Sequence, residues 1–267
     1  MASELILSET RGRVGIVTLN RPDSLNALTG EMRTTLREQI AAWNEDAGIG
    51  AIVITGAGRA YCAGADVSSF QSPPADRASD GAPESQVSPW AGLVRGSKPI
   101  VCAINGVAVG EGITMTLPCD VRLAAPDARL SFRFVRLGLT PEIGSSHVLS
   151  HLTGLGRAVE LMLTARFFTG EEAREYGIVL ETRPKDELLE RAVELAAEIA
   201  EAPAWHLSQA KRMVYEHALE RDLEAVIREE SRVFTEARST AEHREAMAAF
   251  RERRQPKFHP GHGPGPT

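Results

Sequence analysis

Short runs of apolar residues mark the first half of the chain. These runs are rich in β-branched residues and are bounded by Gly, Asn or Pro, which predicts strands at Gly15–Leu19, Ala51–Thr55 and Pro99–Ile104. Between the first two runs, Thr29 is placed to cap a helix whose apolar residues recur every three to four positions, at Met32, Leu36, Ile40 and Trp43. The order strand, helix, strand predicts parallel pairing and an α/β fold.

The second half of the chain changes to a helical pattern. From Gly144 onward, apolar residues follow i, i+3, i+4 spacing, which predicts helices that include Ala158–Leu163, Leu188–Ile199, Trp205–Leu219, Leu223–Phe234 and Ala246–Phe250. Each of these helices has one apolar face. We therefore expect them to pack on the core or on another subunit.

Two segments do not fit either pattern. Residues 71–97 are dominated by Ser, Pro, Gly, Asp and Ala, and we expect a mobile flap there rather than a linker between domains. Its large apolar anchors are Val87, Trp90, Leu93 and Val94. The end of the chain is rich in Pro and Gly, which predicts a disordered tail beyond Phe258.

Composition and charge narrow the class of protein. The 267 residues are 43% hydrophobic and 25% charged, which is typical of a folded globular chain. A net charge of −6 gives no global positive field, so neither nucleic acid nor a membrane is expected as a partner. No apolar stretch approaches the roughly 18 residues needed to span a bilayer, and the amino terminus lacks a leader pattern, which predicts a cytoplasmic location.

Several common catalytic and metal-binding motifs are incomplete or absent in this sequence. Tyr61 stands where a dinucleotide fingerprint would need its third Gly after the strand, and neither a phosphate-binding loop nor a GxSxG elbow occurs. His147 and His151 are four residues apart, but Val148 replaces the Glu of a metalloprotease helix. The cysteines at 62, 102 and 119 have no CxxC spacing, which favours reduced, buried side chains and no metal site.

Two Gly-rich turns remain, and each directly follows a predicted strand. The first is Gly58–Asp66 and the second is Asn105–Gly112. Small residues let a ligand approach the backbone, and a helix that begins after each turn leaves its first N–H groups unpaired. Two such donors would form an oxyanion hole, although spacing alone equally fits two tight structural turns.

The motifs that carry a family resemblance are, in chain order, LNRPDSLNALT, VITGAGRAYCAGAD, KPIVCAINGVAVGEG, CDVRLAA and LGLTPEIGSS. Together they resemble the crotonase family, also called the enoyl-CoA hydratase/isomerase superfamily, over about residues 4–255. The resemblance implies an α/β spiral of ββα units over residues 1–200, a helical trimerisation region over 201–258 and a tail at 259–267. It also implies a homotrimer or a dimer of trimers. The expected partner is an acyl-CoA substrate, so coenzyme A belongs to the substrate and no separate cofactor is expected.

The resemblance assigns the oxyanion hole residue by residue. The first donor falls on the backbone N–H of Ala63, and the second falls on the backbone N–H of Glu111, where the family usually has Gly. The Glu111 side chain must then point away, because a carboxylate would oppose a developing enolate. The residues expected to bind substrate are Ala63, Gly64, Ala65, Asp66, Gly110 and Glu111.

The acid and base residues depart from those of family hydratases. Thr114 and Phe134 stand where hydratases of the family carry two glutamates, so efficient addition of water is not expected. Glu142, in Pro141-Glu142-Ile143-Gly144, is instead similar to the single glutamate of monofunctional enoyl-CoA isomerases. One carboxylate suffices to move a proton from C2 to C4 while an oxyanion hole holds the dienolate.

The sequence leaves alternatives open for the role of Glu142 and for the function of the protein. Glu142 also fits an acidic residue at a helix start, where it would meet the helix dipole. Cys62 lies beside the expected hole, but no His or cation is assigned to it, which argues against a covalent nucleophile. For the whole chain, we predict an enoyl-CoA isomerase, with an enoyl-CoA hydratase and a non-catalytic acyl-CoA-binding paralogue as alternatives.

Overall fold

The structure, a computed structural model, describes residues 4–66 and 89–259. The chain forms two compact units, Met1–Ala197 and Glu198–Thr267. The first unit contains both β-sheets and the second contains helices. The tail predicted for 259–267 lies outside the described residues except for His259, whose ring nitrogen Nε2 is 3.1 Å from the Glu201 carbonyl oxygen.

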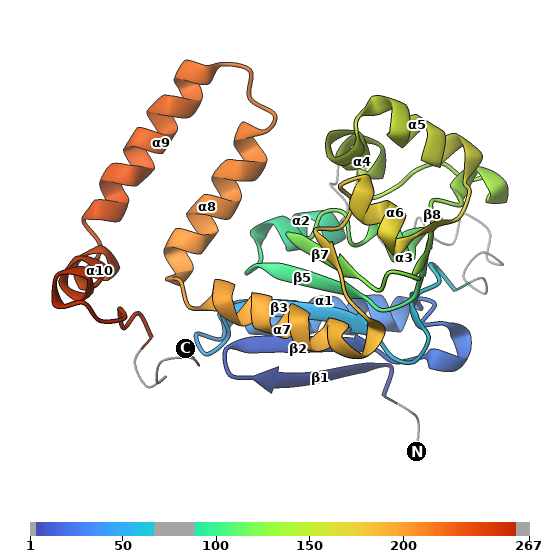
Figure 1. Cartoon of the computed structure of the whole chain (residues 1–267), viewed down its shortest axis with the longest axis horizontal. Helices are drawn as coiled ribbons and strands as arrows, with labels where there is room; N and C mark the ends of the chain where they lie inside the picture. The colour runs from blue at the N-terminus through green and yellow to red at the C-terminus, as the bar shows by residue number, and fades with distance from the viewer. Residues whose placement is uncertain (1–3, 67–88, 260–267) are drawn as a thin grey trace. The chain divides into compact units, whose positions relative to one another are not determined.

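A six-stranded sheet forms the centre of the first unit (Figure 1). Its strands, in spatial order, are β1 (Ile6–Arg11), β2 (Val14–Leu19), β3 (Ala51–Gly56), β5 (Ile100–Ile104), β7 (Val121–Ala124) and β10 (Glu181–Thr182). The β1–β2 pair is antiparallel and the other pairs are parallel. Every residue of β3 and β5 is buried, as expected for strands covered on both faces. The three predicted strands and their parallel pairing are confirmed.

A four-stranded sheet lies beside the chain's Gly-rich turns. Its strands, in spatial order, are β4 (Ala60–Cys62), β6 (Val107–Val109), β8 (Arg129–Ser131) and β9 (Phe168–Thr169). Successive strand pairs β3–β4, β5–β6 and β7–β8 each place their first strand in the large sheet and their second in the small one. Helices α2 (Pro89–Gly96) and α3 (Glu111–Thr114) follow the first two pairs. This repetition is the expected pattern of ββα units.

Helix α1 (Gly30–Glu45) forms where the apolar spacing predicts it. The Thr29 side chain accepts a hydrogen bond from the Met32 backbone N–H, which caps the first turn. The predicted apolar positions are all buried, namely Met32, Leu36, Ile40 and Trp43. At the other end, Lys98 Nζ donates to the carbonyl oxygens of Trp43 and Asp46, both at 2.6 Å, where a cation favourably meets the helix dipole.

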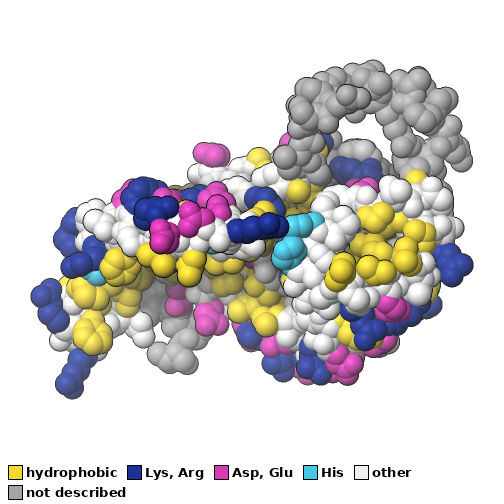
Figure 2. All heavy atoms as spheres, turned by 90° about the horizontal axis from the view of Figure 1, so that it is seen from above, with side chains coloured by type: hydrophobic (Ala, Val, Ile, Leu, Met, Phe, Trp, Pro, Cys, Tyr) yellow, Lys and Arg dark blue, Asp and Glu magenta, His cyan; other side chains and the backbone are white. Residues whose placement is uncertain are grey.

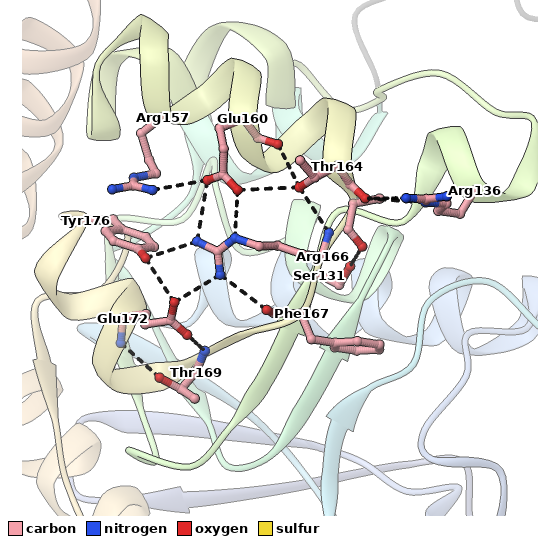
Figure 3. A network of polar contacts seen from close by, with 11 residues as sticks. Ser131, Arg136, Arg157, Glu160, Thr164, Arg166, Phe167, Thr169, Glu172 and Tyr176 are labelled. Carbon is pink, nitrogen blue, oxygen red and sulfur yellow. Dashed lines mark hydrogen bonds and ion pairs between the residues drawn. The ribbon is translucent and has the colours of Figure 1, made fainter.

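A polar network joins several of the later elements of the first unit. Its residues lie on or next to the 3-10 turn η4 (Phe134–Leu137) and the helices α5 (Leu155–Thr164) and α6 (Gly170–Glu175). Helix α4 (Ser145–Thr153) precedes α5 and helix α7 (Lys185–Ala200) follows α6, whereas the 3-10 turn η1 (Pro22–Ser24) lies before α1. Figure 3 shows Arg166 between two carboxylates, at 2.7 Å from Glu160 on α5 and 3.0 Å from Glu172 on α6. Ser131 Oγ donates to the Ala165 carbonyl at 3.0 Å, which joins β8 to the same segment.

The second unit contains three helices beyond the end of α7. They are α8 (Ala204–His217), α9 (Leu223–Arg238) and α10 (Ala241–Glu252), which confirms the helices predicted from the apolar spacing. Asp222 and Thr240 cap α9 and α10 with their side chains. Large apolar side chains remain exposed on these helices, and Figure 2 shows hydrophobic side chains gathered in patches among charged ones.

The expected flap at 71–97 is wrong for its last part. Residues 89–96 form helix α2, in which Val94 is fully buried. The Trp90 indole N–H donates to the Met115 carbonyl oxygen at 2.8 Å, so this part is anchored to the core. The remainder of the predicted flap, through residue 88, lies outside the described residues.

A search of the described helices finds none with the length and apolar character needed to cross a membrane. The cytoplasmic location stays a prediction.

Candidate functional site

The two Gly-rich turns lie side by side because the strands before them are paired. Strands β4 and β6 are parallel, with Ala60 opposite Val107 and Cys62 opposite Ala108. Parallel strands end at the same edge of a sheet, so the turns that follow β4 and β6 are delivered to one place. The local sequence gives each turn its shape, and this strand pairing brings the two together.

Glycine is required where the turns touch. A Cβ on Gly112 would lie 2.0 Å from the Cys62 carbonyl oxygen, and a Cβ on Gly64 would lie 2.7 Å from the Val109 carbonyl oxygen. Gly64 also has a φ of +99°, which L side chains rarely adopt. The Glu111 backbone N lies 3.6 Å from the position that a Gly64 Cβ would occupy. The two backbones therefore meet without side chains between them.

The geometry does not support Ala63 as the first oxyanion donor. Its N–H donates to the Leu25 carbonyl oxygen at 2.9 Å and is therefore already used within the protein. Ala65 is placed differently. It forms a parallel bridge with Leu28. In this bridge the Leu28 N–H donates to the Gly64 carbonyl oxygen, and the Asp66 N–H donates to the Leu28 carbonyl oxygen. The Ala65 N–H consequently points to the opposite side, and it has no acceptor among residues 4–66 and 89–259.

The second expected donor, Glu111, is the first residue of α3. The first N–H groups of a helix have no intrahelical partner, and the Glu111 N–H has no acceptor in the part of the chain that the structure describes. The N–H of the preceding Gly110 is used, because it donates to the Ser131 carbonyl oxygen at 3.0 Å. Ala65 and Glu111 therefore each present a free backbone N–H beside the touching turns.

A buried asparagine fixes the loop that supports the first turn. Asn26 is fully buried and has a φ of +57°, a conformation that Asn tolerates better than most residues. Its Nδ2 donates to the carbonyl oxygens of Ala57 and Ala60 at 2.9 and 2.8 Å, and its Oδ1 accepts from the Arg21 N–H at 2.8 Å. Arg21 then pairs with Asp66 at 2.8 Å, so Asp66 closes the turn onto this loop.

The Glu111 side chain is held by an arginine that the sequence analysis did not identify. Arg33 Nε donates to one carboxylate oxygen at 2.7 Å, and Arg33 NH2 donates to the other. Only 15% of the Glu111 side chain and 30% of the Arg33 side chain are exposed, so this pair is shielded from water on most sides. Arg33 lies on α1, and no local motif connects it to residue 111. The Glu111 carboxylate is thus engaged in an ion pair. This agrees with the expectation that the Glu111 side chain points away from the expected oxyanion hole.

Glu142 lies in the loop between η4 and α4. Its side chain is exposed in the single chain, yet partial desolvation is the largest cause of a pKa raised above the usual range of Glu. The nearby charge of Glu111 raises this pKa further, and Arg33 lowers it. Glu142, Glu111 and Arg33 therefore form one electrostatic cluster. The following residue, Ile143, has a φ of +54°, which is a strained conformation for a β-branched side chain.

The positions of the absent hydratase glutamates are buried and carry no acid. Thr114 is fully buried and Phe134 is 5% exposed. Cys62 is also fully buried, and burial raises the pKa of its thiol to about 12, so a reactive thiolate does not form near neutral pH. Cys102 and Cys119 are buried as well and form no disulfide within the described residues, as expected for reduced core residues. Within the described ranges, no group of three or more His, Cys, Asp or Glu side chains is arranged to hold a metal ion.

Comparison with known proteins identifies relatives over nearly the whole chain. The family model described as enoyl-CoA hydratase/isomerase matches residues 9–261. A probable enoyl-CoA hydratase of Mycobacterium bovis is 36% identical, with 97% of this chain and 99% of the relative covered. The 1,2-epoxyphenylacetyl-CoA isomerase of Escherichia coli is 33% identical, with 96% and 98% covered. The crystal structure of an enoyl-CoA hydratase from Bacillus anthracis superimposes with a TM-score of 0.87 at 30% identity, with 96% and 99% covered. The predicted family and crotonase-like fold are confirmed.

The contact between the turns can be tested without an assay of activity. We expect Gly112→Ala to lower the free energy of unfolding by about 2 kcal/mol or more, because its Cβ would collide with the Cys62 carbonyl and force the strands apart. Gly92→Ala is the matched control, since Gly92 lies inside α2 with open space around it and Ala favours a helix by up to about 1 kcal/mol. Urea unfolding of both variants measures this difference. Equal stabilities for the two variants would show that the turns are not in contact.

Proposed function

The chain belongs to the enoyl-CoA hydratase/isomerase family, and from this premise we propose that it is an enoyl-CoA isomerase. In this reaction a double bond in the acyl chain of a coenzyme A thioester moves by one position through transfer of a proton between C2 and C4. Coenzyme A is part of the substrate, and the proposed reaction needs no other cofactor.

One carboxylate that is coupled electrostatically to Glu111 and is not held in an ion pair carries this proposal. Glu142 forms no salt bridge with another described residue and has a raised pKa, whereas the carboxylate of Glu111 is bound by Arg33. Thr114 and Phe134 supply no acid or base for water. Addition of water requires one group to activate the water and a group to protonate carbon, whereas a 1,3 proton shift requires only one base.

The mechanism assigns one role to each part of the site. The N–H groups of Ala65 and Glu111 hold the thioester oxygen, on which negative charge develops when the C2 proton is removed. Glu142 takes that proton as its carboxylate and returns it to C4 as the carboxylic acid. Ala65 therefore replaces Ala63, whose N–H is occupied by Leu25. Gly64, Asp66 and Gly110 stay in the proposed binding site because they form the turns that present the two donors.

The raised pKa of Glu142 suits this double role. A base that must also return its proton works best when its pKa approaches the working pH. Because Glu142 acts first as carboxylate, activity should fall as the pH drops through its raised pKa, and this fall should lie above the range of an ordinary Glu. Burial against substrate would increase the same desolvation that already dominates the shift.

We expect Glu142→Gln to lower turnover of a 3-enoyl-CoA by about 1,000-fold or more, because it removes the base and keeps the side-chain shape. Binding of a non-reactive acyl-CoA should change little. Steady-state kinetics and a binding titration measure the two effects separately. If the variant keeps turnover within about threefold of the parent, Glu142 is not the base. Acyl-CoA binding with no turnover in either protein would instead favour a non-catalytic binding protein.

Hydration is the second candidate function, and the names of the relatives favour it. The relatives from Mycobacterium bovis and Bacillus anthracis are both described as enoyl-CoA hydratases. We nonetheless expect weak hydration here, because Thr114 and Phe134 cannot activate water. Incubation with a trans-2-enoyl-CoA and measurement of 3-hydroxyacyl-CoA tests this directly. Turnover of about 10 per second or more would make hydration the main activity.

A homotrimer, or a dimer of trimers, is part of the proposal. Exposed apolar residues on α9 and α10 support it, since Leu223, Ile227, Phe234 and Phe250 are between 51% and 80% exposed. Light scattering should give about 87 kDa, three times the chain mass of 28.9 kDa, or twice that value for a dimer of trimers. A stable monomer at micromolar concentration would contradict the proposed assembly.

A further inference from the structure

The residue that supplies the second backbone donor also carries a negative charge. Glu111 contributes its N–H through the start of α3, and its carboxylate belongs to the same residue. An uncompensated carboxylate at this position would repel the enolate oxygen and would discourage ionisation of Glu142. Family members that resemble this chain usually have Gly there, so the side chain creates a problem that the surrounding structure must solve.

Arg33 compensates the negative charge of Glu111 through two hydrogen bonds. Its guanidinium binds both oxygens of the Glu111 carboxylate, one of them at 2.7 Å from Nε. Such paired hydrogen bonds fix the direction of a carboxylate as well as its charge. Lys in the same place would supply charge without this fixed geometry. Because Arg33 extends from α1, which is capped and packed along its length, the guanidinium approaches from a rigid element.

We propose that Arg33 is a positioning residue for the isomerase reaction, which binds the Glu111 carboxylate and thereby keeps the backbone donor of Glu111 aligned and Glu142 available as the base. This inference rests on the proposed function and adds a residue outside the predicted site. Arg33 does not touch the reacting atoms in this assignment. It acts through Glu111.

The charged groups around Glu142 are few in the described part of the chain. Glu111 and Arg33 are the groups that shift its pKa, in opposite directions. Arg33 in turn faces Glu111, Glu142 and the thiol of Cys62. That thiol stays neutral near pH 7, since its pKa is about 12. The charged groups that set the pKa of Glu142 are therefore one positive neighbour, Arg33, and one negative neighbour, Glu111.

Three variants separate charge compensation from simple packing. Arg33→Met leaves the Glu111 charge uncompensated, Glu111→Gln removes that charge, and the double variant removes both. We expect Arg33→Met to lower kcat about 100-fold and to move the acid limb of the pH profile to higher pH. Glu111→Gln should move the limb to lower pH. The double variant should recover at least about tenfold of the activity that Arg33→Met loses.

Arg37→Met is the matched control, because Arg37 lies one turn later on α1 and its guanidinium donates to Thr34 Oγ1 of the same helix at 3.5 Å. We expect it to keep the parent pH profile. If Arg33→Met does not fold, the acid limb of Glu111→Gln still tests the proposal. An acid limb that stays at the parent pH in Glu111→Gln overturns the proposal, as does a double variant no more active than Arg33→Met.

A second readout requires no turnover. The ultraviolet absorption of a cinnamoyl-CoA thioester moves to longer wavelength when hydrogen bonds polarise its carbonyl. The parent protein should produce this shift, Arg33→Met should lose most of it, and the double variant should regain it. If the parent protein polarises the ligand but does not isomerise any 3-enoyl-CoA, the proposed isomerase function is contradicted and the role of Arg33 is not. An Arg33→Met variant that keeps both the parent shift and the parent acid limb would overturn the role of Arg33 alone.

Discussion

Direct contact between two turn backbones is the constraint on which the site depends. Gly112 lies against the Cys62 carbonyl and Gly64 lies against the Val109 carbonyl, with no room for a Cβ at either position. This closeness brings the Glu111 N–H next to the first turn. The pairing of β4 with β6 sets the distance, and the loop around Asn26 holds the first turn from the other side. A ligand oxygen held by two backbone donors needs this spacing to be fixed before the ligand arrives, since donors that must first move contribute less to stabilising the charge.

Electrostatic balance is the second requirement, and it explains how a glutamate can stand beside the proposed oxyanion hole. A carboxylate near developing negative charge is unfavourable in a partly desolvated site. The ion pair with Arg33 changes this, because the two side chains together carry no net charge. The arrangement also leaves Glu142 as the carboxylate that is not bound by Arg33. The Arg33–Glu111 pair, the free backbone donors and the proposed base are therefore parts of one arrangement, and changing the charge of one part alters the others.

The elements that sequence reasoning located best are those whose signal is local. Helix α1 follows from its Thr29 cap and its apolar spacing, and β3 and β5 follow from short β-branched runs. The spiral of ββα units, by contrast, was expected from the family resemblance rather than from the residues. The donor at Ala63 failed for a related reason. Its hydrogen bond to Leu25 joins two loops far apart in sequence, and no property of the motif Cys62-Ala63-Gly64 reveals it.

Arg33 was missed because its partner is 78 positions away. The segment at 89–96 was wrongly grouped with the Ser- and Pro-rich residues before it, although it contains Trp90 and Val94. Burial of Val94 and the Trp90 hydrogen bond decide its structure.

The loop that carries Glu142 also opposes the stability of the fold. Ile143 has a left-handed backbone conformation, which a β-branched residue adopts only when the surroundings impose it. The pKa of Glu142 is raised in the folded protein, so the folded state binds the proton more tightly than the unfolded state does. The stabilisation from that protonated carboxyl is fully present at a pH below the unfolded pKa and is lost as the pH rises through the folded pKa. The fold thus holds the ionised form of Glu142 in an environment that disfavours it. The capped helix α1, the buried central strands and the Asn26 contacts offset this effect, because none of them depends on the ionisation of Glu142. The proposed base is consequently maintained by parts of the molecule that take no part in the proposed chemistry.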